Sequence, residues 1–263
     1  MLPPGDLRMA LAALCGDDQW GRTWADVLQY RFTSDGALHD HAVGNLLIVA
    51  IWELLGQHVE GLDLVGRLLG AHGRVLPMAA VPLDITARVR LTGEPSGRIQ
   101  VVRGQVQVAS TAGEVLEVAL DPPNPPVCEE AAAAIRAADV VVIGPGSWFT
   151  SVIPNLLVPG LREALLDTSA RRVVVLNLAA QPGETSGFSA GTHLEVLGAH
   201  APELAIDVVL ADAGGVTDRD SLEQTAGSLG AELVLADVAM SDGTPRHDPL
   251  RLAAALGSVV GRR

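Results

Sequence analysis

The sequence predicts an α/β protein with a Rossmann-like, three-layer α/β/α arrangement, a mainly parallel sheet and a small β-rich insertion. From residue 128 onward, runs of β-branched residues such as VVVIG at 140–144 and VVVLNL at 173–178 alternate with segments of helical periodicity. Continuous apolar strands of this kind are typical of parallel sheets that helices cover on both faces. Before that, at 74–120, apolar and polar residues alternate as they do in half-exposed strands.

The first half of the chain is predicted to be helical and then β-rich. The helical spacing of apolar residues predicts helices at 5–15, 22–32 and 42–56. Gly56 is suited to close the last of them. ITARVRL at 85–91 and EVLEVAL at 114–120 alternate as strands and are separated by glycine-rich turns. We therefore interpret residues 74–120 as a β-rich insertion or edge.

The second half is predicted to alternate regularly between strands and helices. Strands are expected at 140–144, 173–178, 206–211 and 232–236. Helices are expected at 128–138, 154–167, 189–200, 219–229 and 248–259. The chain has 263 residues, 48% of them hydrophobic, which is enough for one substantial core. A single domain over 1–263 is therefore expected, and the proline-rich stretch at 121–126 is short enough to be an internal connection.

Composition argues against several classes of function. The net charge of -13 would repel a nucleic acid backbone, so no nucleic acid partner is expected. The apolar run at 46–52 is too short to cross a bilayer, and the start of the chain has no signal pattern, so we expect a cytoplasmic protein without membrane insertion. Cys15 and Cys128 are too far apart to form a metal knuckle, and no metal ligand set is apparent. The chain has no lysine, which excludes a lysine Schiff base and a Walker A lysine.

The loop GPGSWFTS at 144–151 follows a predicted strand and precedes a predicted helix. Gly144 and Gly146 would let the backbone approach an anion closely, and Ser147 and Thr150 could join free helix amides in binding phosphate. The alternative is a tight turn whose hydroxyls only cap the helix. The local pattern leaves both interpretations open.

The loop AAQPGETSG at 179–187 follows the next predicted strand. Gln181, Glu184 and Thr185 could supply hydrogen bonds to a ligand. Pro-Gly is also a common turn, and Thr185 or Ser189 could serve as a helix cap. His193, on the helix that follows, is interpreted as a surface residue rather than a ligand or base.

Two further side chains are candidates for ligand contacts. Asn45 lies at the head of the apolar helix, where its amide must find backbone or ligand partners. Arg246 could reach a diphosphate bidentately or pair with a surface carboxylate. Asp248 and Pro249 are a natural cap and first position for the last helix. The loops on adjacent strand ends, with Asn45 and Arg246, should converge on one cleft at the carboxyl edge of the parallel sheet.

Taken together, six segments resemble the YvcK/CofD-like gluconeogenesis factor family, which shares a fold with 2-phospho-L-lactate transferase. They are LPPGDLRMALAAL at 2–14, QYRF at 29–32, HAVGNLLIVA at 41–50, GPGSWFTSVIPNLLVPG at 144–160, QPGETSGF at 181–188 and RHDPLRLA at 246–253. Each motif is modest alone, but six in this order are specific. Members of that family usually begin upstream with a first strand and a glycine-rich loop. The resemblance therefore implies that the chain lacks both and that Met1 is a misassigned start.

The resemblance implies a cytoplasmic regulatory protein that binds a UDP-sugar such as UDP-N-acetylglucosamine and affects cell shape through cell-wall synthesis or regulatory proteins. The alternative is an enzyme of the 2-phospho-L-lactate transferase type, which would need Mg²⁺ and carboxylates near a diphosphate. Asp6 is then the best candidate carboxylate, although a helix cap is its simpler role. No other cofactor is implied. A largely apolar edge strand is compatible with a homodimer.

Overall fold

A computed structural model describes residues 5–91, 97–111 and 113–261 of the chain. The chain divides into two compact units, Met1–Ala80 and Val81–Arg263, and each is described by itself. The expectation that 1–263 forms a single domain therefore stays a prediction. The expectation about Met1, and the first three residues of the segment at 2–14, lie outside the described residues.

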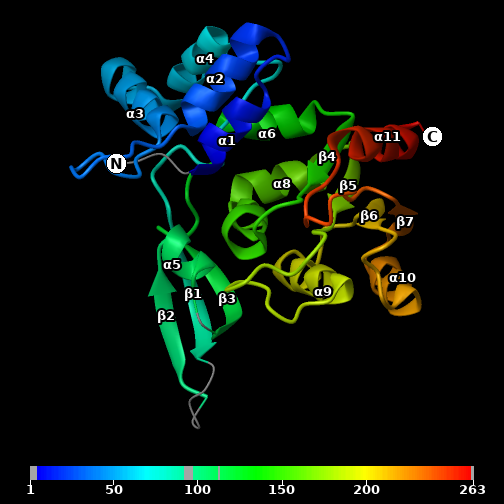
Figure 1. The fold of residues 1–263 in the computed structure, drawn as a ribbon. Helices are drawn as coiled ribbons and strands as arrows, with labels where there is room; N and C mark the ends of the chain where they lie inside the picture. The colour runs from blue at the N-terminus through cyan, green and yellow to red at the C-terminus, as the bar shows by residue number, and fades with distance from the viewer. Residues whose placement is uncertain (1–4, 92–96, 112, 262–263) are drawn as a thin grey trace. The chain divides into compact units, whose positions relative to one another are not determined.

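The first unit is a group of four helices (Figure 1). They are α1 Gly5–Ala13, α2 Gln19–Gln29, α3 Val43–Leu55 and α4 His58–Leu69. Leu11, Leu28 and Ile48, from three different helices, are fully buried in their common core. Gly56 ends α3 in the left-handed conformation, as its position in the sequence predicts. Gly61 allows α3 and α4 to approach closely, because a Cβ there would lie 2.5 Å from the Trp52 ring.

The second unit begins with a three-stranded antiparallel sheet of order β2-β1-β3. The strands are β1 Asp84–Leu91, β2 Ile99–Arg103 and β3 Gly113–Asp121, and the short helix α5 Gln105–Ala109 lies between the last two. Ile85, Ala87 and Val89 of β1 are buried, whereas Arg88 points to the other face and pairs with Glu117 of β3 at 3.0 Å. The small β-rich sheet that the sequence predicts is confirmed, with its strands between 84 and 121, whereas the bounds 74–120 of an insertion stay a prediction.

The rest of the second unit is built on a four-stranded parallel sheet of order β4-β5-β6-β7. The strands are β4 Val140–Ile143, β5 Arg171–Val175, β6 Val208–Asp212 and β7 Glu232–Ala236. The helices around it are α6 Glu129–Arg136, α7 Ile153–Leu156, α8 Pro159–Asp167, α9 Ala190–His200, α10 Arg219–Ser228 and α11 Pro249–Val260. A single π-type turn, Trp148–Val152, precedes α7.

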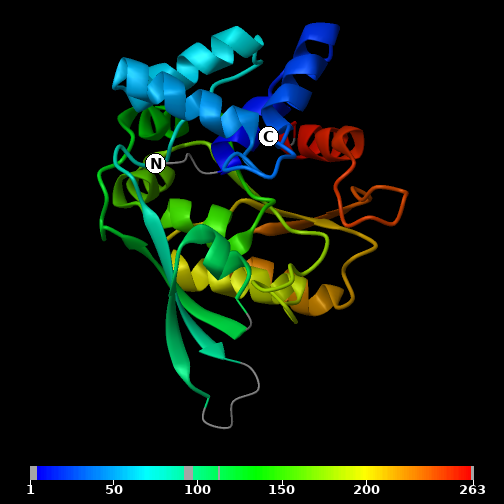
Figure 2. The ribbon, with the colours of Figure 1, turned by 60° about the vertical axis from the view of Figure 1, so that its left-hand side comes forward.

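Helices cover both faces of the parallel sheet. Ala255 and Val259 of α11 pack in one cluster with Val173 of β5 and Val208 of β6. Figures 1 and 2 show α9 and α10 on the other side of the sheet from α11. All three valines of β5, at 173–175, are buried, as expected for a strand covered on both faces. The predicted α/β class and mainly parallel sheet are confirmed.

Three features of the helices and strands differ from the sequence prediction. The predicted helix at 154–167 is two helices, because Pro159 has no amide hydrogen to donate and instead starts α8 at its first position. Helix α4 was not predicted, since its two glycines lower helix propensity and tertiary packing supplies the missing stability. Strand β2 was also missed. It is five residues long and most of its side chains are exposed, so its position depends on pairing with β1.

Candidate functional site

The loops that follow β4 and β5 lie at the same edge of the parallel sheet and are joined by one buried carboxylate. Glu184 is 4% exposed, and its Oε1 accepts hydrogen bonds from the Ser147 hydroxyl and from Thr150 Oγ1, the latter at 2.8 Å. Its Oε2 accepts from the amide of Phe149 at 3.3 Å. The structure thus brings three predicted site residues together, and all three are hydrogen-bonded to one another within the protein.

A second contact between these loops involves Asn177, which is not among the site residues predicted from the sequence. Its Oδ1 accepts from the Gly146 amide at 3.0 Å and its Nδ2 donates to the Gly146 carbonyl at 2.8 Å. Gly144 adopts φ +75°, and a Cβ there would lie 2.9 Å from the carbonyl oxygen of Val175. Gly144 therefore allows the loop to pack closely on β5, and Gly146 holds it through its two backbone bonds to Asn177. The feature of the sequence that could have pointed to Asn177 is its position at the end of a predicted strand.

The remaining predicted residues of the second loop are mostly internal. Thr185 is fully buried, and its Oγ1 accepts from the Gln181 amide at 2.8 Å. Gln181 Oε1 is buried and has no hydrogen-bond partner. Ser189, rather than Thr185, caps α9 by accepting from the Thr192 amide at 3.1 Å. The loop thus contains one buried acceptor that is not satisfied within the protein.

The interpretation of His193 as a surface residue is wrong. The side chain is 4% exposed, because the rings of Trp148 and Phe188 pack edge-on against it with centroids 5.2 and 5.3 Å away. Its Nδ1 lies 2.8 Å from the carbonyl oxygen of Ser189, and its Nε2 is buried without a partner. Burial lowers the pKa of this imidazole, and the bond to the Ser189 carbonyl opposes that effect. The buried surroundings therefore favour the uncharged form of the ring.

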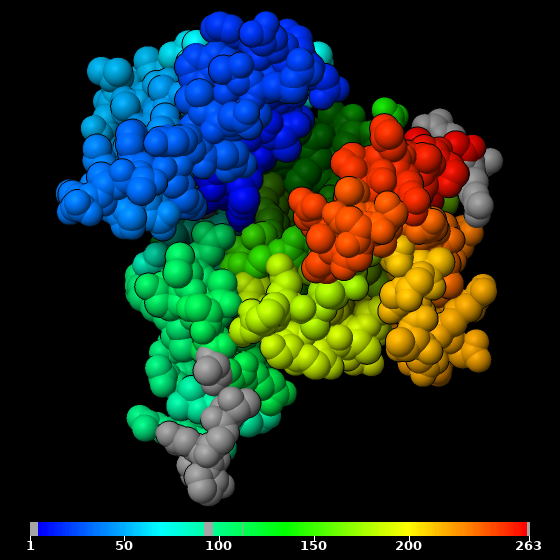
Figure 3. Space-filling view, in the orientation of Figure 1, coloured from blue at the N-terminus to red at the C-terminus, as the bar shows by residue number. Residues whose placement is uncertain are grey.

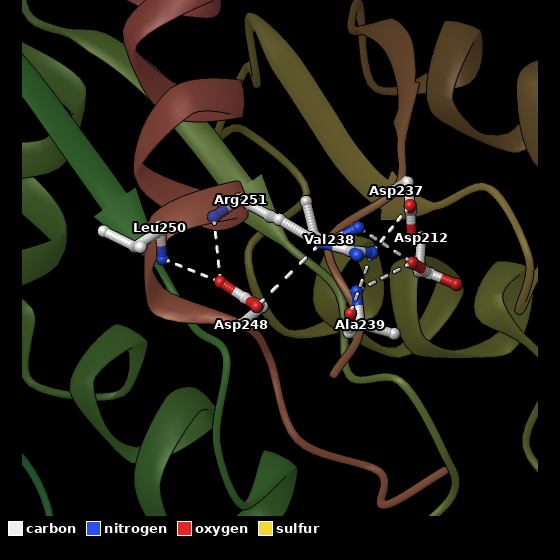
Figure 4. Close-up of polar contacts among 7 residues, drawn as sticks. All are labelled: Asp212, Asp237, Val238, Ala239, Asp248, Leu250 and Arg251. Carbon is white, nitrogen blue, oxygen red and sulfur yellow. Dashed lines mark hydrogen bonds and ion pairs between the residues drawn. The ribbon is translucent and has the colours of Figure 1, made fainter. Parts of the chain in front are cut away.

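A third group of residues lies at the carboxyl ends of β6 and β7 (Figure 4). Asp212, the last residue of β6, accepts through Oδ1 from the amides of Val238 and Ala239 at 3.0 and 3.1 Å. These bonds fix the segment after β7 against the end of β6. Asp248 caps α11 by accepting from two amides of its first turn, as predicted. Arg251, one turn into α11, pairs with Asp237 at 2.7 Å.

His247 stands between these strand ends and was not selected from the sequence. Burial lowers its pKa, while the charge of Asp212 and a bond to the backbone of Leu176 oppose the shift. Its Nε2 is buried without a partner, as in His193. A sequence signal did exist, since Asp212 follows a strand directly and His247 precedes a helix cap, but neither position reveals that the two meet.

Arg246 pairs with a surface carboxylate, which is one of the two roles that the sequence suggests for it. Its Nη2 lies 3.3 Å from Asp242 Oδ2 and its Nε donates to Thr244 Oγ1 at 3.2 Å. The guanidinium is exposed, with a side chain 69% accessible to solvent. A role for Arg246 in binding a diphosphate stays a prediction.

Asp6 and Asn45 belong to the first unit. Asp6 lies in the first turn of α1, and Asn45 Oδ1 accepts from Nε of the buried Arg8 at 3.1 Å. The oxygen of Asn45 thus has a side-chain partner, and a ligand contact of its amide stays a prediction. Whether either residue joins the loops of the second unit in one cleft stays a prediction.

A pocket of about 340 Å³ opens at the carboxyl edge of the parallel sheet. Its walls come from the residues after β5, the start of α9, the loop after β6 and the start of α10. His193 and Phe188 are among the lining residues. In Figure 3, the segment around α9 (yellow-green) and the segment after β7 (orange) are both visible on the same face of the molecule.

No group of three or more His, Cys, Asp or Glu side chains in the described ranges is placed to hold a metal ion. No helix in the described part of the chain is long and apolar enough to span a membrane.

Comparison with known proteins gives concordant matches. A family model described as 2-phospho-L-lactate transferase CofD matches residues 1–244. A Mycobacterium tuberculosis (strain ATCC 25618 / H37Rv) protein named "Putative gluconeogenesis factor" is 52% identical over 100% of this chain and 77% of its own length. A Listeria innocua protein named "Gluconeogenesis factor" is 32% identical over 97% of this chain and 80% of its own length. The crystal structure of protein BH3568 from Bacillus halodurans, 29% identical, superimposes with a TM-score of 0.82 over 97% of this chain and 83% of that one.

Proposed function

Because the chain belongs to the CofD family, whose members include the gluconeogenesis factors, we propose that it is a cytoplasmic regulatory protein that binds a UDP-sugar. The ligand would occupy the carboxyl edge of the parallel sheet, where ligands of open α/β sheets bind. UDP-N-acetylglucosamine is the preferred candidate. Binding would then report nutrient state to partners that control cell-wall synthesis and cell shape.

The observation that carries the choice of site is the distribution of unsatisfied polar atoms. Five buried side-chain nitrogen or oxygen atoms in the described residues have no hydrogen-bond partner. Four of them, in Trp148, Gln181, His193 and His247, lie in the loops and first turns beyond the carboxyl ends of the strands. Buried polar groups are normally paired, so such a concentration is typical of a surface completed by water or ligand.

Recognition of the diphosphate is assigned to Arg246. Its guanidinium is exposed, and within the described ranges its side-chain partners are Asp242 and Thr244, which it can exchange for phosphate oxygens. Ser147 and Thr150 are less suited to direct phosphate contact, because both hydroxyls are already bonded to Glu184. In this proposal, the loop at 144–151 shapes the site, and Arg246 supplies the positive charge.

Calorimetric titration of UDP-N-acetylglucosamine, UDP and a deazaflavin into the purified protein tests the proposal. We expect the two uridine nucleotides to bind and the deazaflavin not to bind. Arg246→Gln should weaken both uridine ligands about tenfold, which is the loss of one charge-assisted contact. Arg136→Gln, an exposed arginine on α6, is the matched control and should leave both affinities unchanged. Wild-type protein that binds neither uridine nucleotide would refute the proposal.

The second candidate is a 2-phospho-L-lactate transferase activity, favoured by the description of the matching family model. Mg²⁺ in such sites is usually held by one or two carboxylates together with the phosphates of the substrate. Asp6 is the carboxylate available for that role in the sequence interpretation. Deazaflavin binding that depends on Mg²⁺, in the same titration, would favour the transferase over the regulatory protein.

The regulatory part of the proposal requires a cellular measurement. Replacing the chromosomal gene by the Arg246→Gln variant should alter cell shape in the same direction as deletion, because a protein that binds its ligand more weakly responds less to it. The Arg136→Gln replacement should keep wild-type shape. Normal morphology in cells that carry the Arg246→Gln variant would separate ligand binding from the control of shape.

A further inference from the structure

The pocket between α9 and α10 has features that suit one part of a nucleotide sugar better than the rest. Its volume of about 340 Å³ is at the lower end of the range of about 300–1,000 Å³ for small-molecule sites. Ser189 and Asp218, the caps of the two helices, both line it. Two helix N-termini would ordinarily favour an anion. Here, however, one of the caps is itself a carboxylate.

The hydrogen-bond state of His193 indicates what the pocket can bind. The Ser189 carbonyl can only accept, so Nδ1 of His193 must carry the hydrogen of their bond. In a neutral imidazole the other nitrogen then carries a lone pair, and Nε2 is an acceptor without a donor. A phosphate oxygen cannot supply that donor, whereas a hydroxyl group can.

We propose that this pocket is the sugar subsite, in which His193 Nε2 accepts a hydrogen bond from a hydroxyl of the sugar ring. The inference rests on the proposed function and adds the position and chemistry of the sugar. Asp218 disfavours the diphosphate in this pocket through its charge, so in this proposal the phosphates lie outside the pocket and Arg246, which does not line it, is their partner. In this arrangement the sugar occupies the acceptor-rich pocket and the diphosphate contacts the cationic side chain of Arg246.

Phe188 is the side chain that must move when the sugar enters. Its ring lies edge-on to His193, lines the same pocket and is half-buried. While the Phe188 ring is in this position, His193 Nε2 has almost no solvent-accessible surface. A sugar would displace the ring outward and stack its apolar face against it, which is a common way for aromatic side chains to contact ligands.

Two substitutions at position 193 separate the acceptor from the rest of the ring. His193→Asn retains an amide hydrogen near the place of Nδ1 and removes the acceptor at Nε2, whereas His193→Gln can place an oxygen near Nε2. His200→Asn is the matched control, because His200 lies on the same helix and makes the same Nδ1 contact to Val196, but does not line the pocket. Thermal midpoints without ligand report any general loss of folding.

The measurement is calorimetric titration of UDP-N-acetylglucosamine and of UDP into each variant. We expect His193→Asn to weaken the nucleotide sugar about tenfold and leave UDP unchanged, since one hydrogen bond is lost. His193→Gln should stay within about threefold of wild type, and His200→Asn should bind both ligands normally. Equal weakening of UDP and UDP-sugar in His193→Asn, or no weakening of either, would overturn the subsite.

A second readout keeps the proposal testable if uridine nucleotides do not bind at all. Nitrogen NMR of His193 in the wild-type protein, titrated with free N-acetylglucosamine, should shift the Nε2 resonance and leave His200 unchanged. That shift without nucleotide binding would refute the proposed function and retain the sugar pocket. An unchanged Nε2 resonance at saturating sugar would refute the pocket itself.

Discussion

The two edges of the parallel sheet differ in cavity volume and in whether their polar groups are hydrogen-bonded within the protein. The amino edge has the larger cavity, about 660 Å³, and the carboxyl edge one of about 340 Å³. At the amino edge, the Arg172 amide and guanidinium both bond to Asp207, and Arg171 donates to the Val259 carbonyl at 2.6 Å. At the carboxyl edge, buried atoms of Gln181, His193 and His247 have no partner.

This difference shows that the volume of a cavity alone is a poor guide to a ligand-binding site. Polar groups that pair with one another stabilise the ends of strands and have little to offer a ligand. Polar groups that are desolvated and unpaired cost folding free energy, which binding of the right partner recovers. The carboxyl edge is therefore the edge at which we propose that the ligand binds, and the following variants test this contrast from the largest expected effect to the smallest.

The largest effect is expected from removing the carboxylate that joins the two loops. Glu184→Ala leaves the donors of Ser147, Phe149 and Thr150 buried without an acceptor, and we expect a loss of about 3 kcal/mol of unfolding free energy. Urea denaturation measures it. Asp207→Ala at the amino edge is the control, because its side chain is 41% exposed and solvent screens its ion pair, so about 1 kcal/mol or less is expected. Equal losses would remove the contrast between the edges.

The next largest effect concerns the two glycines of the loop at 144–151. Gly144→Ala should cost about 2–3 kcal/mol, since its φ is +75° and the new methyl group would lie 2.9 Å from the Val175 carbonyl. Gly146→Ala should cost about 1 kcal/mol, because its φ of +156° is unfavourable but its neighbours are 3.9 Å away. Thermal and urea unfolding rank the two variants. The reverse order would show that this loop is not held against β5 as described.

For Gly146, affinity separates the two interpretations of the loop. The bulkier Gly146→Val variant should lower the thermal midpoint. If the loop also cradles phosphate, the same variant should weaken UDP-sugar binding. Unchanged affinity with a lowered midpoint would show that the loop has only a structural role, which is what its internal bonds to Asn177 favour.

A smaller effect is expected on the pH dependence of stability. Burial lowers the folded-state pKa of both His193 and His247, so the unfolded chain takes up protons first as the pH falls below its imidazole pKa of about 6.5. Their contribution to stability is therefore present above that pH and lost below it. Urea unfolding of His193→Asn between pH 7.5 and 5.5 should show a shallower decline than wild type. His39→Asn, at an exposed position, should follow the wild-type curve.

The smallest effect is expected for ligand binding after changes at the amino edge. Asp207→Ala should leave UDP-sugar affinity within about twofold of wild type, because its carboxylate lies at the opposite ends of the strands from the proposed site. Calorimetry under the conditions used for Arg246→Gln measures it. A tenfold loss would move the ligand, or an essential coupling to it, to the larger cavity.

The periodicity of the sequence predicted most of the architecture. Strand β7 has the predicted bounds, 232–236, and the other parallel strands are within a few residues of theirs. Such strands can be predicted from the sequence because burial on both faces requires a continuous apolar run. A few residues are enough to reveal such a run. The cap at Asp248 was equally readable, since a cap and its amides are neighbours in the chain.

The sequence by itself thus determined the fold class, the alternation of strands and helices after residue 128, the family and the loops that follow the parallel strands. Only the tertiary structure decided which polar groups in those loops satisfy one another. Glu184 bonds to residues 34 to 37 positions away, and His193 is buried by the ring of Trp148, 45 positions earlier. Burial and pairing depend on such distant neighbours, and so does the distinction between a structural side chain and one left to bind a ligand. Local sequence patterns carry no information about them.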